Sequence, residues 1–238
     1  MTKLVTYDLS GEIARIGIDD GKRNVMNARM LAAIHQALDR AELEARAVLL
    51  AGREGIFSAG FDLQVFSRRD PEEIHTMMRL GAELALRLFA FPKPVVVACT
   101  GHAYPMGAFL MLASDYCVGI HRPYHIGLNE VAIGIAIPSF AIELARTTLA
   151  PHYFHRIATG ELLDPNEALK AGYIDRLVAA ADIDRAAVER AENLASVDLA
   201  AFQLTKSRVR SEAIATIRSA IDREITIEAY RQHPGIKG

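Results

Sequence analysis

The sequence predicts an α/β protein in which most strands pair in parallel, and three observations support this fold class. Short apolar runs rich in valine, such as residues 95–98, alternate with longer segments whose apolar residues recur at helical spacing. Such alternation is typical of strands joined by helical crossovers. After Pro138 the pattern is helical almost throughout, so a helical region is expected to follow the sheet. The length of 238 residues suits one large domain, or one domain with a small appendage.

Composition narrows the class of protein further. Hydrophobic residues make up 51% of the chain and charged residues 24%, as in ordinary globular proteins. The formal net charge of −2 provides no general attraction for nucleic acid or an anionic membrane. Cys99 and Cys117 both lie in apolar runs and are expected to be buried free thiols. We find no signal-peptide pattern and no apolar run of spanning length, so a cytoplasmic protein is expected.

The first 51 residues are predicted to form a hairpin, a helix and a strand. Residues 3–9 and 12–18 read as two short strands around a turn at Gly11. A polar loop follows, and residues 28–44 have the spacing of an amphipathic helix. Residues 47–51 are apolar throughout, which predicts a short buried strand.

The next segment is predicted to be a loop followed by a long helix. The loop contains three glycines, Gly52, Gly55 and Gly60. Residues 71–91 have one continuous apolar face at helical spacing, and Pro92 and Pro94 end the helix. The strand that begins at Val95 follows directly.

A glycine turn after this strand leads into a second, apolar helix. Pro105 occupies the position that proline favours at the start of a helix, and residues 107–113 are almost all apolar. The helix is therefore expected to be buried on all sides. Its first turn presents unpaired backbone N–H groups at Met106 and Gly107, which is a place to stabilise negative charge.

One carboxylate lies in apolar surroundings beyond the next strand. Residues 116–120 are strand-like, and Glu130 lies in the middle of the segment 127–134, which is otherwise mostly apolar. Donors for an anion together with a single carboxylate suggest proton-transfer chemistry. A surface glutamate would be the plainer interpretation of Glu130 taken alone.

The C-terminal part is predicted to be helical with one further strand. Asp164 and Gly172 suit the two ends of a short helix, and residues 173–178 read as a strand. Two or three helices are expected from residue 182 onward. We therefore divide the chain into a core domain, residues 1–181, and a helical region, residues 182–238.

Three motifs occur in order along the chain and carry a family resemblance. Residues 57–63 read F-S-A-G-F-D-L, residues 93–115 run from Lys-Pro through a valine-rich strand and a glycine turn to Ser-Asp, and residues 167–175 read E-A-L-K-A-G-Y-I-D. Together they resemble the crotonase superfamily, also called the enoyl-CoA hydratase/isomerase family. Any one of the motifs alone would be weak evidence, because a glycine-bearing β–α turn is common.

The resemblance implies a crotonase (ClpP-like) fold of repeated β-β-α units with a helical C-terminal trimerisation region. It implies a homotrimer or a hexamer (a dimer of trimers), an acyl-CoA thioester as substrate, and no metal or cofactor beyond the CoA moiety. It also implies that the N–H groups of Phe61 and Met106 hold the thioester oxygen. Two preorganised donors would stabilise the enolate formed when a proton next to the thioester is removed.

The carboxylates favour an isomerase within this family. Its hydratases use two glutamates, and Phe109 occupies the position of the first while Glu130 matches the second. Residues 127–138 resemble the corresponding segment of mitochondrial-type Δ3,Δ2-enoyl-CoA isomerases, which work with one glutamate. A single carboxylate can take a proton from one carbon and return it to another, and burial should raise its pKa. The alternatives are a hydratase or hydrolase in which Asp62 or Glu143 replaces the missing glutamate, and a non-catalytic acyl-CoA-binding protein.

Further residues are expected at the site. The predicted substrate-binding residues are Arg23, Val25, Ala59, Gly60, Asp62, Leu63, Gly107 and Phe109. By resemblance, the loop of Lys22, Arg23 and Asn24 lies near the CoA phosphates, and Lys206 lies close to CoA. Asp62 is expected to cap or brace its loop, and His102 to hydrogen-bond the turn backbone. The other histidines lack metal-ligand spacing. Because Phe61, Met106 and Phe109 are bulky, we expect a short or unbranched acyl group.

Overall fold

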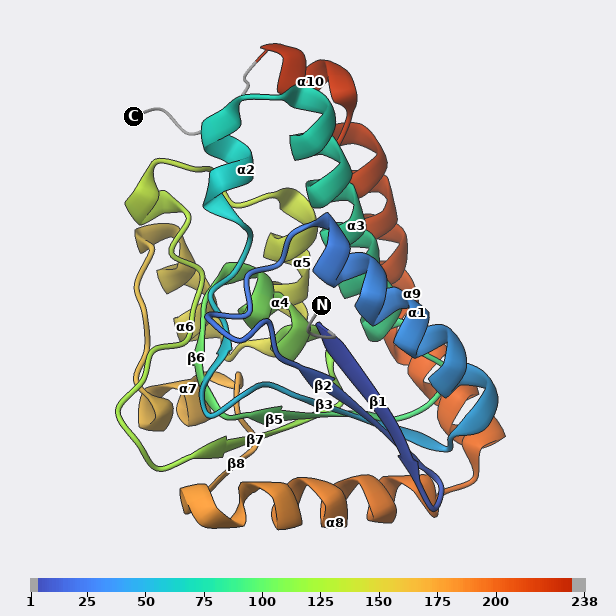
Figure 1. Ribbon diagram of the computed structural model, residues 1–238. Coiled ribbons are helices and arrows are strands. Elements are labelled where there is room, and N and C mark those ends of the chain that lie inside the picture. Colours follow the sequence, from blue (N-terminus) through green and yellow to red (C-terminus); the bar gives the residue numbers. More distant parts are fainter. Residues whose placement is uncertain (1–3, 233–238) are drawn as a thin grey trace.

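Six strands form the main sheet, which crosses the middle of the molecule (Figure 1). The structure is a computed structural model that describes residues 4–232. The strand order is β1-β2-β3-β5-β7-β8, with β1 antiparallel to β2 and every other neighbouring pair parallel. The strands are β1 (Val5–Ser10), β2 (Ile13–Ile18), β3 (Ala47–Ala51), β5 (Val95–Cys99), β7 (Tyr116–Ile120) and β8 (Arg176–Val178). The predicted α/β class with mostly parallel pairing is confirmed.

A second, two-stranded sheet lies where we expected only a loop. It pairs β4 (Gly55–Ser58) in parallel with β6 (Gly101–Ala103). The strands touch at two glycines, since a Cβ atom added to Gly101 would lie 2.1 Å from the carbonyl carbon of Gly55. Strands this short and this rich in glycine carry too little alternation to be seen in the sequence. The pairing brings together the two turns that contain the predicted backbone donors.

Helices make up most of the remaining chain. They are α1 (Ala28–Glu44), α2 (Leu63–Arg68), α3 (Pro71–Phe89), α4 (Pro105–Ala113), α5 (Ser139–Thr148), α6 (Pro151–Phe154), α7 (Pro165–Ala171), α8 (Ile183–Ala195), α9 (Leu199–Glu224) and α10 (Ile227–Gln232), with short 3-10 helices η1 (Val131–Ile133), η2 (His155–Thr159) and η3 (Ala180–Asp182). No helix between residues 4 and 232 is long and apolar enough to cross a membrane.

Both faces of the main sheet are covered, which explains why its central strands are apolar throughout. Helices α1, α3 and α4 lie on one side, and α8 runs along the opposite side (Figure 1). In β3, Val48 and Leu50 belong to the larger core under α1 and α3. Leu49 belongs to a smaller core with Val96 and the alanines of α8. Cys99 and Cys117 are buried and free, as predicted.

Helix ends follow the capping residues in the sequence. Asn27 accepts a hydrogen bond from the N–H of Met30 at 3.0 Å and begins α1. Asp164 accepts from the N–H groups of Asn166 and Glu167 and begins α7, while Gly172, with a φ of 101°, ends it. The predicted cap pair of this helix is confirmed.

The helical C-terminal region packs closely on the rest of the chain. Helix α9 contacts α3 and α5, and α10 contacts α3. Ile217, Ile221 and Ile225 are buried in the larger core, so their helical spacing reflects core packing. The division at residues 181 and 182 stays a prediction.

Candidate active site

Two glycine turns bring the backbone of Phe61 next to that of Met106. Gly60 has a φ of 84°, in the left-handed region that favours glycine. A Cβ atom added to Gly60 would lie 3.4 Å from the nitrogen of Pro105, so the two turns are in van der Waals contact. The first turn is fixed from inside, because the N–H of Gly60 donates to Ser58 Oγ at 3.0 Å. The predicted donors are therefore neighbours in space.

Both predicted donors are free of protein partners. Among the described residues, no group accepts a hydrogen bond from the N–H of Phe61 or of Met106. Tyr104, the N-cap of α4, makes no side-chain cap bond. By contrast, Asp62 caps α2 by accepting from the N–H of Gln64 at 3.0 Å, as expected. Two unused donors are what an anionic oxygen would need.

A cavity of about 610 Å³, lined mainly by apolar side chains, lies beside these turns. Eight of the predicted site residues line it: Arg23, Val25, Ala59, Phe61, Asp62, Leu63, Phe109 and Glu130. Three others are not among the lining residues: Gly60, Met106 and Gly107. Sequence reasoning missed the remaining lining residues, among them Phe66, Met78, Tyr104, Ile133 and Leu162. Phe66 and Met78 come from helical segments in which a cavity-facing apolar residue is indistinguishable from a core residue.

Glu130 is a buried acid in the wall of the cavity. Its exposed fraction is 6%, and neither carboxylate oxygen has a hydrogen-bond partner among the described residues. Burial raises the pKa of Glu130 from its ordinary 4.5 to about 7. The expected rise in pKa is confirmed. A carboxyl group in this state can both accept and return a proton near neutral pH.

The chain on either side of Glu130 is held by backbone pairing. Ile126 and Leu163 exchange both backbone hydrogen bonds, at 3.0 and 2.8 Å, and the N–H of Gly127 donates to Ala103 O at 3.2 Å. The segment before Glu130 therefore lies between β6 and residues 161–163. After Glu130, its carbonyl oxygen accepts from the N–H of Ile133, the last residue of η1, at 3.0 Å and from the N–H of Ile135 at 2.9 Å.

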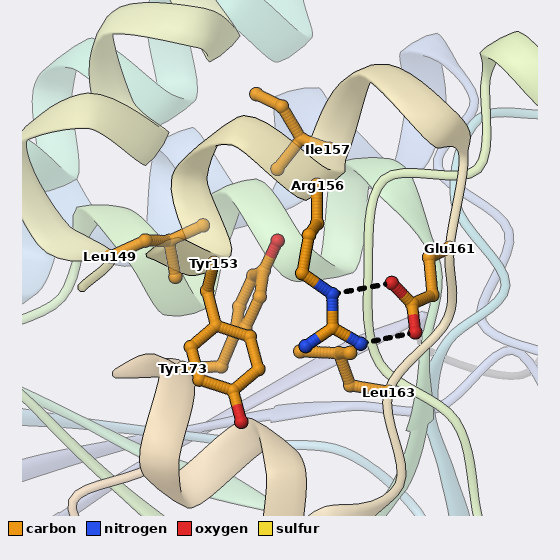
Figure 2. Close-up of a pocket in the computed structure, with 7 residues that line it drawn as sticks. All are labelled: Leu149, Tyr153, Arg156, Ile157, Glu161, Leu163 and Tyr173. Atoms are coloured by element: carbon orange, nitrogen blue, oxygen red, sulfur yellow. Dashed lines mark hydrogen bonds and ion pairs between the residues drawn. The ribbon is translucent and has the colours of Figure 1, made fainter. Parts of the chain in front are cut away.

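An ion pair anchors the segment that holds Gly127 in place. Figure 2 shows Arg156 and Glu161 facing each other, with Arg156 Nε 2.7 Å from Glu161 Oε2. The cavity beside this pair is only about 10 Å³, room for about one water molecule. It is too small for a substrate.

Three phenylalanines form a row, and two of them, Phe61 and Phe109, line the cavity. The rings of Phe61 and Phe109 meet edge to face with centroids 6.5 Å apart, and those of Phe109 and Phe140 at 5.4 Å. Phe109 and Phe140 are fully buried, whereas Phe61 is partly exposed to the cavity. Phe109 therefore places an aromatic ring in the cavity wall, at the position that corresponds by resemblance to the first glutamate of the hydratases.

The two candidates for a second carboxylate differ in position. Asp62 lines the cavity but uses one oxygen to cap α2. Glu143 is not among the lining residues and pairs with Arg146 at 3.2 Å. Glu130 and Asp62 are thus the acidic side chains of the described cavity wall.

Lys206 is not among the residues that line the cavity, and its expected position near CoA stays a prediction. Its side chain is buried, and its Nζ lies 2.7 Å from Asp115 Oδ2, next to Arg210 on the same helix α9. This group joins α9 to the start of β5, because Asp115 also accepts from the N–H of Val95. In this structure Lys206 forms a buried ion pair with Asp115 that joins two elements of the fold.

The three residues of the early polar loop, Lys22, Arg23 and Asn24, differ in their position relative to the cavity. Arg23 is exposed and lines the cavity, but Lys22 does not. Asn24 is fully buried with a φ of 52°, and its side-chain amide donates to Ile18 O and Phe57 O. Asn24 is therefore an internal brace, and Arg23 is the residue of this loop that lines the cavity.

His102 does bond a backbone group, but that group belongs to His125 beyond β7 and not to the glycine turn as predicted. The Nδ1 atom of His102 accepts from the N–H of His125 at 3.1 Å, and the ring of His102 stacks on Tyr104 with centroids 5.6 Å apart. In the part of the chain that the structure describes, no three His, Cys, Asp or Glu side chains cluster closely enough to hold a metal ion.

Comparison with known proteins gives one consistent family. The model of the enoyl-CoA hydratase/isomerase family matches residues 8–234. Human mitochondrial enoyl-CoA delta isomerase 1 is 26% identical over 227 residues, covering 93% of this chain and 75% of that protein. A putative enoyl-CoA hydratase of Thermus thermophilus is 31% identical over 210 residues, covering 82% and 79%. The solved structure of an enoyl-CoA isomerase of Mycobacterium tuberculosis is 35% identical, covers 98% of this chain and 100% of its own, and has a TM-score of 0.89.

Proposed function

The chain belongs to the enoyl-CoA hydratase/isomerase family and has its crotonase fold, and on that premise we propose that it is an enoyl-CoA isomerase. It moves the double bond of a 3-enoyl-CoA to the 2-position. The observation that carries the proposal is Glu130, a buried carboxyl group without partners and with a pKa of about 7, next to a phenylalanine at position 109.

The reaction is a proton transfer through a dienolate. Glu130 removes a proton from C2, and the electron pair of that C–H bond passes into the conjugated system, placing negative charge on the thioester oxygen. The N–H groups of Phe61 and Met106 stabilise that oxygen. Protonated Glu130 then returns the proton to C4, which leaves the double bond between C2 and C3. Substrate and product have the same mass.

The acyl-CoA lies along the cavity in this proposal. Arg23 at the cavity edge provides positive charge for a CoA phosphate, and Val25 and Ala59 line the same side. No metal or redox cofactor takes part, since the only group transferred is a proton. We further propose a cytoplasmic homotrimer, or a hexamer of two trimers, as the resemblance implies.

The second candidate is an enoyl-CoA hydratase. A relative with 31% identity is named as a putative hydratase, and Asp62 is the one other acid on the described cavity wall. A hydratase must hold a water molecule, and the ring of Phe109 provides no hydrogen bond for it. A binding role without catalysis is a third reading, against which the retained Glu130 argues.

The test uses trans-3-hexenoyl-CoA and trans-2-hexenoyl-CoA as separate substrates, with products followed by mass spectrometry. We expect the 3-enoyl substrate to be converted at unchanged mass, with the new 2-enoyl group detected by its absorbance, and this activity to be lost in Glu130→Gln. Addition of one water to the 2-enoyl substrate would support the hydratase. Binding of acyl-CoA without turnover of either substrate would support the non-catalytic binding role.

A further inference from the structure

Helix α3 contains a glycine at its middle, opposite the two proposed donor residues. Gly81 is buried, and glycine weakens a helix interior relative to alanine. A Cβ atom added to Gly81 would lie 2.5 and 2.6 Å from Cε1 and Cζ of the Phe61 ring, and 3.2 Å from Met106 Sδ. The first two distances are shorter than real Cβ contacts allow. The glycine is therefore required by these neighbours rather than by its own backbone.

The two residues that carry the proposed donors, Phe61 and Met106, both have side chains in contact with α3 at Gly81. We call this contact surface at Gly81 the seat. Phe61 follows β4, and Met106 lies in the first turn of α4, 45 positions along the chain. The ring of Phe61 is held on its other side by Phe109, and Met106 is fully buried. Both side chains are thus confined between α3 and α4. Since each side chain is confined, the backbone N–H of its residue is confined as well.

We propose that Gly81 is a positioning residue, which aligns the N–H groups of Phe61 and Met106 by giving both side chains one common seat on α3. This inference rests on the proposed function, because it assumes that the two donors hold an enolate oxygen. Gly81 does not touch the substrate in this proposal. It acts through Phe61, and its effect should depend on the ring of Phe61.

The first variant is Gly81→Ala. The added methyl group overlaps the outer atoms of the Phe61 ring, and because Phe109 packs on the same ring, relief of the overlap should shift the whole residue together with its N–H. We expect kcat to fall by about 10-fold or more, since losing one such donor costs about 10²–10³ in rate. The dissociation constant of saturated hexanoyl-CoA should change less than about 3-fold, because ground-state binding does not use the aligned donors. The unfolding midpoint should show that the variant is folded.

The matched variants separate positioning from general damage. Phe61→Leu removes the outer ring atoms and empties the seat, so kcat should fall in this single variant too. In the double variant the new methyl group occupies the emptied seat, so kcat should recover above that of either single variant. Thr76→Ala, an exposed change on the same helix that also favours helix formation, should leave kcat unchanged.

A spectroscopic measurement provides a readout that needs no turnover. Acetoacetyl-CoA bound to aligned donors should show an increased ultraviolet absorbance of its enolate, and Gly81→Ala should reduce this increase. An inactive wild type would count against the isomerase, while the enolate signal would still test the seat. A folded Gly81→Ala variant with wild-type kcat and enolate signal would overturn the proposal. It would also be overturned if Gly81→Ala lowered kcat by the same factor in the wild-type protein and in Phe61→Leu. If Gly81→Ala does not fold, an unchanged kcat in Phe61→Leu overturns it.

Discussion

At the scale of single residues, Glu130 holds its carboxyl group in a buried position in the cavity wall. A buried carboxylate usually pairs with a cation or accepts several hydrogen bonds. Neither oxygen of Glu130 has a partner among the described residues. The protonated and ionised forms are therefore close in free energy near neutral pH, which a group that alternates between base and acid requires.

This balance predicts the pH dependence of the reaction. The ionised form of Glu130 starts the reaction, so kcat/KM for trans-3-hexenoyl-CoA should rise with pH and level off, with an apparent pKa of about 7. The measurement is an initial-rate profile between pH 5 and pH 9. A profile that is already nearly level at pH 5 would mean that Glu130 is solvated in the working enzyme.

The same carboxyl group should lower the stability of the folded protein at higher pH. Its folded-state pKa is above its unfolded value, so its charge is tolerated better in the unfolded chain. The free energy of unfolding should therefore fall as pH rises from about 4.5 to 7, by about 3 kcal/mol in total. Glu130→Gln should lack this decrease, and urea unfolding of both proteins at pH 5 and pH 8 measures it. Equal pH dependence in the two proteins would contradict the prediction.

Phe109 should limit the shape of the acyl group. Phe109→Ala removes the middle ring of the phenylalanine row and enlarges the cavity, so the ratio of turnover for a branched 3-enoyl-CoA to that for the hexenoyl substrate should rise. Loss of a buried ring should also lower the free energy of unfolding by about 3 kcal/mol. A change at exposed Leu43, Leu43→Ala, should leave the ratio unaltered. An unaltered ratio in Phe109→Ala would show that this ring does not select the acyl shape.

Some site residues could be predicted from the sequence, and others had no local signal. Glu130 and Phe109 lie in motifs with fixed spacing, so their shared cavity was expected. Gly81 stands between apolar residues of a regular helix, and nothing in α3 itself shows that two distant side chains meet there. Asn24 was misread because its loop is polar, while its amide is used entirely inside the protein.

At the scale of elements, the long helices and main strands were predictable, whereas the short elements were not. The residue bounds of α1, β3, α4 and β7 agree with the sequence pattern because each has a clear period and a clear end. β4 and β6 are four and three residues long. They form because their glycines allow close backbone contact across 46 positions, which is a tertiary effect.

The buried ion pair of Lys206 ties α9 to the sheet, and its removal should destabilise the protein. Lys206→Met leaves Asp115 with the N–H of Val95 and with Arg210, so the loss is partly compensated. We expect the free energy of unfolding to fall by about 2 kcal/mol, measured by urea unfolding at pH 7.

The control for this change is Lys170→Met. Lys170 Nζ lies 2.7 Å from Glu167, the same distance as in the buried pair, but its side chain is largely exposed. Exposed pairs contribute about 0–1 kcal/mol, so this variant should unfold nearly like the wild type. Equal effects of the two substitutions would show that burial does not matter here.

At the scale of the whole molecule, the C-terminal helices complete the core on both sides of the sheet. Alanines 186, 187, 191 and 195 of α8 cover one face, and their small side chains bring the helix close to β3 and β5. On the other side, α9 contributes Ile217 and Ile221 to the core beneath α3. The sequence showed a helical end with apolar spacing, but it could not show which face of the sheet each helix would cover.

This arrangement predicts that α8 and α9 do not unfold as a separate unit. Without α8, one face of four parallel strands would be exposed to water, and without α9 the core beneath α3 would be open. Hydrogen exchange measured at increasing urea should therefore show the same midpoint for peptides from β3 and β5 and for peptides from α8 and α9. Earlier loss of protection in α8 and α9 would contradict the prediction and would support two independent units. Ala191→Asp places a charge between α8 and the sheet, so it should lower the midpoint in both sets of peptides together.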